Sequence, residues 1–211
     1  YYIFDRNEKI RLMVDKVKGT ILKNKEDQNL FIAYYDDEQH MKDLLWQTYI
    51  GEFDTALKEN QFAMYLQPQT DRYGNMMGAE ALVRWNRPAE GTLMPGAFIE
   101  CFEESGLIYR LDHYVWRAAA QRLKTWKEQG CSCYISVNIS VKDFYYMDVY
   151  QIFMDLVQEY DIDIEKLHIE ITETAFSENE LLTQAAITKL HDAGFVIEFD
   201  DFGSGYATLI F

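Results

Sequence analysis

Apolar residues recur with two different rhythms along this chain, and the rhythm changes near residue 60. Before that point they return every three or four residues, from Ile10 to Leu22 and again from Met41 to Leu57, which predicts two helices. Asp5 can cap the first helix, and the second should cover about 36–60, with a kink or break at Gly51. The apolar run 30–35 predicts a short strand between them. The first segment is therefore expected to fold as helix, strand and connecting helix.

After residue 60, short apolar runs alternate with longer stretches of helical spacing. The runs predict strands over 62–67, 76–83, 134–139, 167–171 and 195–200, and the longer stretches predict helices over 96–104, 111–129, 149–160 and 179–193. Gly194 stands where a helix would end, directly before the last strand. Strands that alternate with helices are typical of an α/β protein with a parallel sheet.

Polar side chains follow the apolar cores of the five strands predicted after residue 60. They are Gln67, Glu80 with Arg84, Asn138, Glu170 with Glu173, and Asp200 with Asp201. Because the carboxyl ends of the strands of a parallel barrel meet at one mouth, we expect these side chains to converge there. Carboxylates and an amide oxygen suit Mg²⁺ or Mn²⁺, and their number favours a site for two ions, which could act on a phosphodiester.

The sharpest of these features is the pair Asp200-Asp201, which precedes Phe202-Gly203-Ser204-Gly205. Adjacent carboxylates repel each other, and near a protein interior they need a cation, a basic group or protonation. Taken by itself, the motif is more typical of a solvated acidic turn. The polar residues at the other strand ends shift the interpretation towards a metal site.

The composition excludes several classes of protein. A hydrophobic content of 48% in 211 residues predicts a packed core, and a net charge of −15 argues against nonspecific binding to a nucleic-acid polymer. The sequence contains no run of about 18 apolar residues, so it predicts no membrane span in this chain. The start of the chain does not resemble a signal peptide. The three cysteines, Cys101, Cys131 and Cys133, are interpreted as reduced core thiols of a cytoplasmic protein.

Six motifs in order carry a resemblance to a known family. They are Gln67-Pro68, Glu80-Ala81-Leu82-Val83-Arg84-Trp85, Met94-Pro95 with Glu103-Glu104-Ser105-Gly106-Leu107-Ile108, Val137-Asn138-Ile139-Ser140, Glu170-Ile171-Thr172-Glu173, and Asp200-Asp201-Phe202-Gly203-Ser204-Gly205-Tyr206. In order and spacing, the chain from about Phe53 to its end resembles the EAL family of cyclic-di-GMP phosphodiesterases.

The resemblance implies a distorted (β/α)₈ barrel of TIM type, with about five strands in this chain, that opens cyclic-di-GMP to linear pGpG with two Mg²⁺ or Mn²⁺ ions. It implies a homodimer and a cytoplasmic location. It also implies roles for single residues. Glu80, Asn138, Glu170, Asp200 and Asp201 would bind metal, and Gln67, Leu82 and Arg84 would contact the substrate. Glu80, Asp200, Asp201 and Glu173 would form the catalytic group, with Glu173 anchoring the loop after Asp201.

The sequence ends at Phe211, before the segments in which the family carries a lysine that helps to activate water and a further glutamate ligand. Five strands cannot close an eight-stranded barrel. We therefore expect this chain to be a piece of a longer protein, whose other parts could include a membrane anchor or a sensor. We do not expect the piece to be active by itself.

The resemblance divides the chain in two. Residues 51–211 would be an EAL domain, while residues 1–50 resemble the tail of a GGDEF domain with its linker helix, although a plain helical linker fits them nearly as well. Two other functions stay open beside the enzyme: a receptor that binds cyclic-di-GMP without cutting it, and a scaffold for dimerisation.

Overall fold

The computed structural model describes residues 9–23, 35–172 and 180–200, and the chain divides into two compact units, 1–48 and 49–211. The described part of the first unit contains α1 (Ile10–Lys23) and the beginning of α2 (Asp37–Lys58). The side chain of Asp36 caps α2, because its Oδ1 accepts hydrogen bonds from the backbone N–H groups of Glu38 and Gln39. Both helices match their predictions, and α2 passes through Gly51 without a break.

Two expectations for this region fall outside the described residues. These are the cap by Asp5 and nearly all of the strand at 30–35. Within the described part of the chain, Tyr35 does not belong to a strand.

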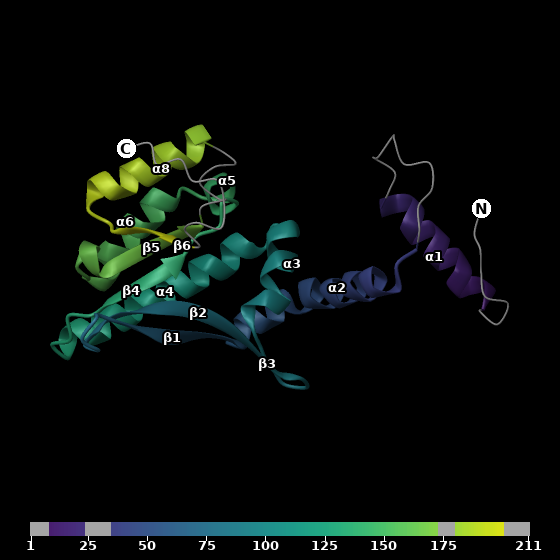
Figure 1. The fold of residues 1–211 in the computed structure, drawn as a ribbon, viewed down its shortest axis with the longest axis horizontal. Coiled ribbons are helices and arrows are strands. Elements are labelled where there is room, and N and C mark those ends of the chain that lie inside the picture. The colour runs from purple at the N-terminus through teal and green to yellow at the C-terminus, as the bar shows by residue number, and fades with distance from the viewer. Residues whose placement is uncertain (1–8, 24–34, 173–179, 201–211) are drawn as a thin grey trace. The chain divides into compact units, whose positions relative to one another are not determined.

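The second unit is built on a six-stranded sheet (Figure 1). Its strands are β1 (Phe62–Thr70), β2 (Met76–Arg87), β3 (Gly91–Leu93), β4 (Tyr134–Asn138), β5 (Leu167–Thr172) and β6 (Ile197–Asp200). They lie in the order β1-β2-β4-β5-β6, with β3 beside β2. Every strand predicted after residue 60 is present, and β3 was not predicted.

The strand directions differ from the expectation in one respect. β2, β4, β5 and β6 are parallel, but β1 runs antiparallel to β2. The cause is the short connection of residues 71–75, in which Asp71 Oδ1 accepts the N–H groups of Tyr73 and Asn75 and Gly74 has a positive φ. A parallel neighbour would need a crossover of a dozen residues or more, so this turn permits only a hairpin.

Helices connect the parallel strands. They are η1 (Pro95–Ala97), α3 (Ile99–Glu104), α4 (Ile108–Glu128), α5 (Asp143–Tyr146), α6 (Val149–Tyr160), η2 (Ile164–Lys166) and α8 (Glu180–Ala193). α4 packs against β4, α6 lies beside α4, and α8 lies beside α6 (Figure 1). The helix predicted over 96–104 is divided into η1 and α3. Gly194 follows α8 with φ +109°, a conformation that favours glycine, so the chain turns there towards β6.

The core lies on one face of the sheet. In β2, the buried Ala79, Ala81, Val83 and Trp85 alternate with the half-buried Glu80, Leu82 and Arg84. Trp85 packs in an aromatic cluster whose other members are Tyr49, Phe53, Phe62, Phe98 and Phe102. We call this side the apolar face and the opposite side the polar face.

An ion pair joins the end of α2 to β2. The buried guanidinium group of Arg87 donates to both carboxylate oxygens of Glu52, with N···O distances of 2.7–3.0 Å, and also pairs with Glu90. The same group lies over the rings of Tyr49 and Trp85. The last turns of α2 are thus part of the second unit's core.

The cysteines differ from the expectation. Cys101 is a buried core thiol, but Cys131 is exposed and Cys133 is only partly buried. The prediction that all three are core thiols is therefore wrong for two of them, because the segment between α4 and β4 runs over the surface. Among the helices of the described residues, none has the length and hydropathy needed to cross a membrane.

Candidate functional site

The polar face gathers side chains from five strands. Residues that pair across a sheet lie on the same face, and the register places Glu80 opposite Gln67 and Ser136, and Glu170 opposite Asn138 and Glu198. Applied along the sheet, this rule places on the polar face, among others, Tyr65, Gln67, Gln69, Gly78, Glu80, Leu82, Arg84, Tyr134, Ser136, Asn138, His168, Glu170 and Glu198.

Three of the predicted metal ligands come together on this face. The Nδ2 of Asn138 donates to Oε1 of Glu80 at 3.2 Å, and Asn138 is the register neighbour of Glu170. On its other side, Glu170 accepts a hydrogen bond from Nε2 of Gln69, over 3.4 Å. Side chains from β1, β2, β4 and β5 therefore meet at one place, as the sequence predicts for Glu80, Asn138 and Glu170.

The carboxyl group of Glu170 lies in an acidic and nearly buried place. The pKa of Glu170 is raised to about 7, chiefly by burial and also by the neighbouring Glu80 and Glu198, against the opposing effect of Ser136. The residue is 5% exposed. A bound divalent cation would stabilise the ionised form of such a carboxyl group, so the donors present fit an oxygen-loving metal ion.

A histidine supports this acidic group. Nδ1 of His168 lies 2.5 Å from Oε1 of Glu198, and Nε2 of His168 lies 3.2 Å from the carbonyl oxygen of Glu165, to which it donates. The ring of His168 stacks on Tyr134 at a centroid distance of 3.8 Å. His168 thus holds Glu198 beside Glu170. The sequence analysis missed both residues, although each stands two positions before a predicted ligand and so shares its face.

The residues predicted to contact a substrate share the polar face. The guanidinium group of Arg84 lies 5.6 Å from the ring centroid of Tyr65, and its Nη1 donates to the carbonyl oxygen of Val83. Leu82 pairs with Tyr65, and the exposed Gln67 pairs with Glu80. A positive group and an apolar side chain therefore lie along the same strand as the acidic group.

Hydrogen bonds from the loop after β4 to residues of three helices, α3, α4 and α5, position Asn138. Nε1 of Trp116 in α4 donates to the carbonyl oxygen of Asn138 at 3.0 Å. Two residues further, the backbone N–H of Ser140 donates to Oδ2 of Asp143, and its hydroxyl group donates to Oε1 of Glu103, both at 2.9 Å. These bonds restrict the backbone directly after Asn138.

Beneath this loop lies a pair of buried carboxyl groups, Asp112 and Asp143. Burial raises the pKa of Asp143 to about 7, against the effect of hydrogen bonds from Ser140 and Asp112. The pKa of Asp112 is raised well above its usual range by burial, then by the charge of Asp143 and the hydrogen bond to it. The pair therefore holds a proton that Asp112 donates to Asp143.

Three of the predicted site residues lie wholly or partly outside the described part of the chain. Glu173 and Asp201 lie outside the described residues, and of Asp200 only the backbone is described, which ends β6 opposite Thr172. Within the described ranges, no group of three or more His, Cys, Asp or Glu side chains is arranged to hold a metal. The complete ligand set thus stays a prediction.

The geometric premise of the prediction was correct only in part. Asn138 and Asp200 end their strands, but Gln67, Glu80 and Arg84 lie inside β1 and β2. What brings Gln67, Glu80 and Asn138 together is the shared face of the sheet and its register, because β1 is antiparallel and β2 continues past the site.

Comparison with known proteins identifies the family of the sequence. Residues 50–211 match the family described as EAL domain. The cyclic di-GMP phosphodiesterase PdeR of Escherichia coli is 31% identical over 154 residues, and the bifunctional diguanylate cyclase/cyclic di-GMP phosphodiesterase MucR of Pseudomonas aeruginosa is 28% identical over 158 residues. These alignments cover 73% and 74% of this chain.

The fold agrees with that match. The solved structure of the PaMucR phosphodiesterase in complex with c-di-GMP superposes with a TM-score of 0.73 and 27% sequence identity, covering 76% of this chain and 66% of the other. The chain spans 23% of the length of each of the two curated relatives.

Proposed function

This chain belongs to the EAL-domain family, and from that premise we propose that it forms part of a metal-dependent phosphodiesterase that hydrolyses cyclic-di-GMP to linear pGpG in bacterial signalling. The observation that carries the proposal is the arrangement of Glu80, Asn138 and Glu170, in which Asn138 is hydrogen-bonded to Glu80 and is the register neighbour of Glu170. Arg84 lies on the same face of the sheet. The fold is a partial TIM-like α/β fold with a parallel sheet, as the superposition on an EAL phosphodiesterase shows.

The proposal assigns a metal site to the acidic part of the polar face. Glu80, Asn138 and Glu170 would bind Mg²⁺ or Mn²⁺ through their side-chain oxygens, and Asp200 and Asp201 would complete a site for two ions. The amide nitrogen of Asn138 is engaged with Glu80, which leaves the amide oxygen as its donor to a cation. When bound, such ions activate water and neutralise the charge that develops on the phosphodiester.

The other residues of the polar face would bind and orient the nucleotide. Arg84 would bind a phosphate through its planar fork of N–H groups, and Tyr65 beneath the guanidinium group would restrict its position. Leu82 would pack against an apolar part of the substrate, and Gln67 would donate or accept hydrogen bonds at the rim of the site. Glu173 would anchor the loop that follows Asp201.

Three further parts of the proposal concern the setting of the domain. Residues 1–50 would be the tail of a GGDEF-like or sensor segment with its linker helix, and the EAL domain would begin at about residue 51. The assembly would be a homodimer. The location would be cytoplasmic, because the proposed substrate is an intracellular second messenger.

The test uses the full-length protein that contains this chain. We expect it to convert cyclic-di-GMP to pGpG with Mn²⁺ or Mg²⁺, as followed by separation of the nucleotides. Glu80→Gln keeps the shape of the side chain but removes its charge and should lower kcat on the order of 100-fold. The control Glu128→Gln, at an exposed position near the end of α4, should leave kcat unchanged.

Binding measured by calorimetry separates the enzyme from the receptor. Tight binding of cyclic-di-GMP with no product in either metal would contradict the proposed hydrolysis and identify a receptor. Absence of both binding and product would favour a scaffold.

A further inference from the structure

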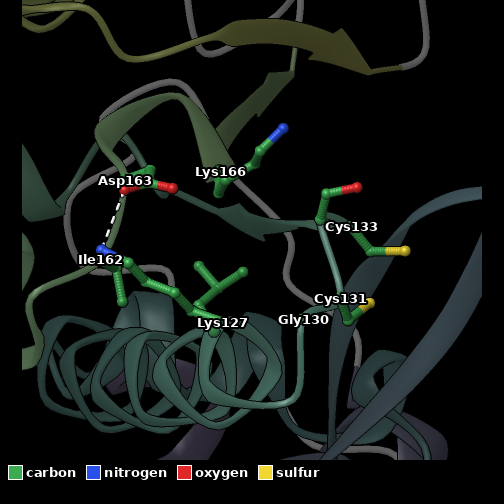
Figure 2. Close-up of a pocket in the computed structure, with 9 residues that line it drawn as sticks. Lys127, Gly130, Cys131, Cys133, Ile162, Asp163 and Lys166 are labelled. Carbon is green, nitrogen blue, oxygen red and sulfur yellow. Dashed lines mark hydrogen bonds and ion pairs between the residues drawn. The ribbon is translucent and has the colours of Figure 1, made fainter.

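The segment between α4 and β4 carries two thiols one residue apart at the surface. Cys131 is exposed and Cys133 is partly buried at the edge of a pocket of about 230 Å³ (Figure 2). Lys127, Asp163 and Lys166 also line this pocket. It lies at the start of β4, whereas Asn138 stands at the end of that strand, so it is separate from the candidate site.

The two sulfur atoms are close enough to interact. Figure 2 shows them on the same side of the segment. The Cα atoms of residues two positions apart in a chain are separated by at most about 7 Å, which is near the upper end of the range found in disulfides. The chain itself therefore keeps this pair within the reach of an S–S bond.

The environment gives the two thiols different roles. Burial raises the pKa of Cys133, as do the hydrogen bond and charge of Cys131, against the opposing effect of Lys166. Cys133 also donates to the carbonyl oxygen of Met76, over 3.8 Å. Cys133 thus keeps its proton, while the exposed Cys131 is the sulfur that a dissolved reagent meets first.

Charges of both signs surround the pocket. Nζ of Lys127 lies 2.8 Å from the carbonyl oxygen of Asp161 and 3.1 Å from Oδ1 of Asp163. Lys166 has an ion pair of 3.7 Å with Glu165 and acts electrostatically on Cys133. Acidic partners therefore offset both lysines, and the charges do not select between an anionic and a neutral reagent.

We propose that Cys131 and Cys133 form a redox site that is reversibly oxidised to an intramolecular disulfide by a small disulfide such as oxidised glutathione. This thiol chemistry is independent of the phosphodiester hydrolysis proposed above.

The exchange takes place in two steps. The thiolate of Cys131 attacks one sulfur of the reagent, whose S–S bond breaks and releases one thiolate, leaving a mixed disulfide on Cys131. Cys133 then loses its proton to water and attacks the sulfur of Cys131, which expels the second thiolate. The protein dithiol loses two electrons, the reagent gains them, and each released thiolate takes up a proton according to its pKa.

The experiment treats the reduced full-length protein with oxidised glutathione, quenches it with acid and digests it with trypsin. Cleavage after Lys127 and Lys142 gives one peptide, 128–142, that contains both cysteines. We expect this peptide to lose two hydrogens in mass and to regain them with dithiothreitol. Cys133→Ser should trap the mixed disulfide on Cys131, and Cys131→Ser should abolish the loss of two hydrogens. Cys101→Ser, at the buried thiol, should change nothing.

Other results would overturn the proposal. A wild-type peptide that stays reduced, or one that accumulates the mixed disulfide without resolving it, contradicts an intramolecular disulfide. Oxidised glutathione and neutral hydroxyethyl disulfide should both give the intramolecular disulfide, because the charges around the pocket are balanced. A wild-type peptide that forms the disulfide with neither reagent contradicts the proposal.

Discussion

The two faces of β2 differ in what they contribute, although their residues alternate along one strand. Trp85 and its neighbours on the apolar face are buried among aromatic rings, whereas Glu80, Leu82 and Arg84 on the polar face are half-buried. The apolar face stabilises the fold, and the polar face carries the candidate chemistry. Because a single step along the strand changes the face, substitutions at neighbouring positions can separate stability from activity.

The largest expected effect is on the apolar face. Trp85→Ala would leave a cavity among the aromatic rings and should lower the free energy of unfolding by about 3–5 kcal/mol. Leu82→Ala, three positions earlier on the half-buried polar face, should cost only about 1 kcal/mol. Urea denaturation of both variants measures the difference. Equal losses would contradict the division of β2 into two faces.

The carboxyl pair beneath the loop after β4 should make stability depend on pH. The pKa of Asp143 is about 7 in the folded protein and about 4 in an unfolded chain, so the folded state binds more protons between these values. The contribution of Asp143 to stability should be greatest below about pH 4 and should be lost as pH rises towards 7, with a slope of up to about 1.4 kcal/mol per pH unit.

Denaturation at several pH values, compared with Asp112→Asn, checks this expectation. The amide can still donate to Asp143 but does not titrate, so the slope should become flatter. The control is Asp192→Asn, which removes an exposed carboxylate and should leave the slope unchanged. A slope unaffected by Asp112→Asn would show that the pair does not hold the proton.

The beginning of the polar face should be as tightly packed as a core. A Cβ atom at Gly78 would lie 2.4 Å from the ring of Tyr134, so Gly78→Ala should destabilise the protein by about 1–3 kcal/mol. At Gly51 in α2 no atom lies within 4 Å of the added Cβ, and Gly51→Ala should stabilise by about 0.5–1 kcal/mol. Thermal denaturation gives both signs. A neutral Gly78→Ala would mean that the ring of Tyr134 moves freely.

The smallest expected change in stability accompanies a clear effect on function. Arg84→Lys retains the charge but loses the planar donor fork, and it should raise KM for cyclic-di-GMP roughly tenfold while the free energy of unfolding changes by less than about 0.5 kcal/mol. Arg122→Lys, at an exposed position in α4, should leave KM unchanged. Steady-state kinetics with the full-length protein measures both. An unchanged KM in Arg84→Lys would exclude a two-pronged contact with a phosphate.

Much of the fold could be predicted because the hydrophobic rhythm is strong. Periodicity alone predicted the helices that contain Leu44 and Trp116. It also predicted the five strands expected after residue 60, with bounds that differ by a few residues from the structure. Periodicity carries no information on strand direction, so the antiparallel β1 followed only from the length of the turn at Asp71. The three-residue β3 was missed because so short a strand shows no period.

The roles of the predicted site residues stay predictions, but the placement of three of them is described. The structure brings Glu80, Asn138 and Glu170 together on one face of the sheet. His168 and Glu198 were missed because the search followed strand ends and motif residues, while the position of a side chain in a sheet depends on parity and register. The exposed dithiol was also misread, since a cysteine count says nothing about burial.

The ion pair of Glu52 with Arg87 bears on where a recombinant fragment of this protein should start. A fragment beginning at the first strand, after Lys58, would lack Tyr49 and Phe53, so the rings of Phe62 and Trp85 would be exposed to water. It would also leave the buried guanidinium group of Arg87 without the carboxylate of Glu52. Start sites chosen upstream of Tyr49 keep these contacts. The last turns of α2 should therefore be included in any recombinant fragment that contains the sheet.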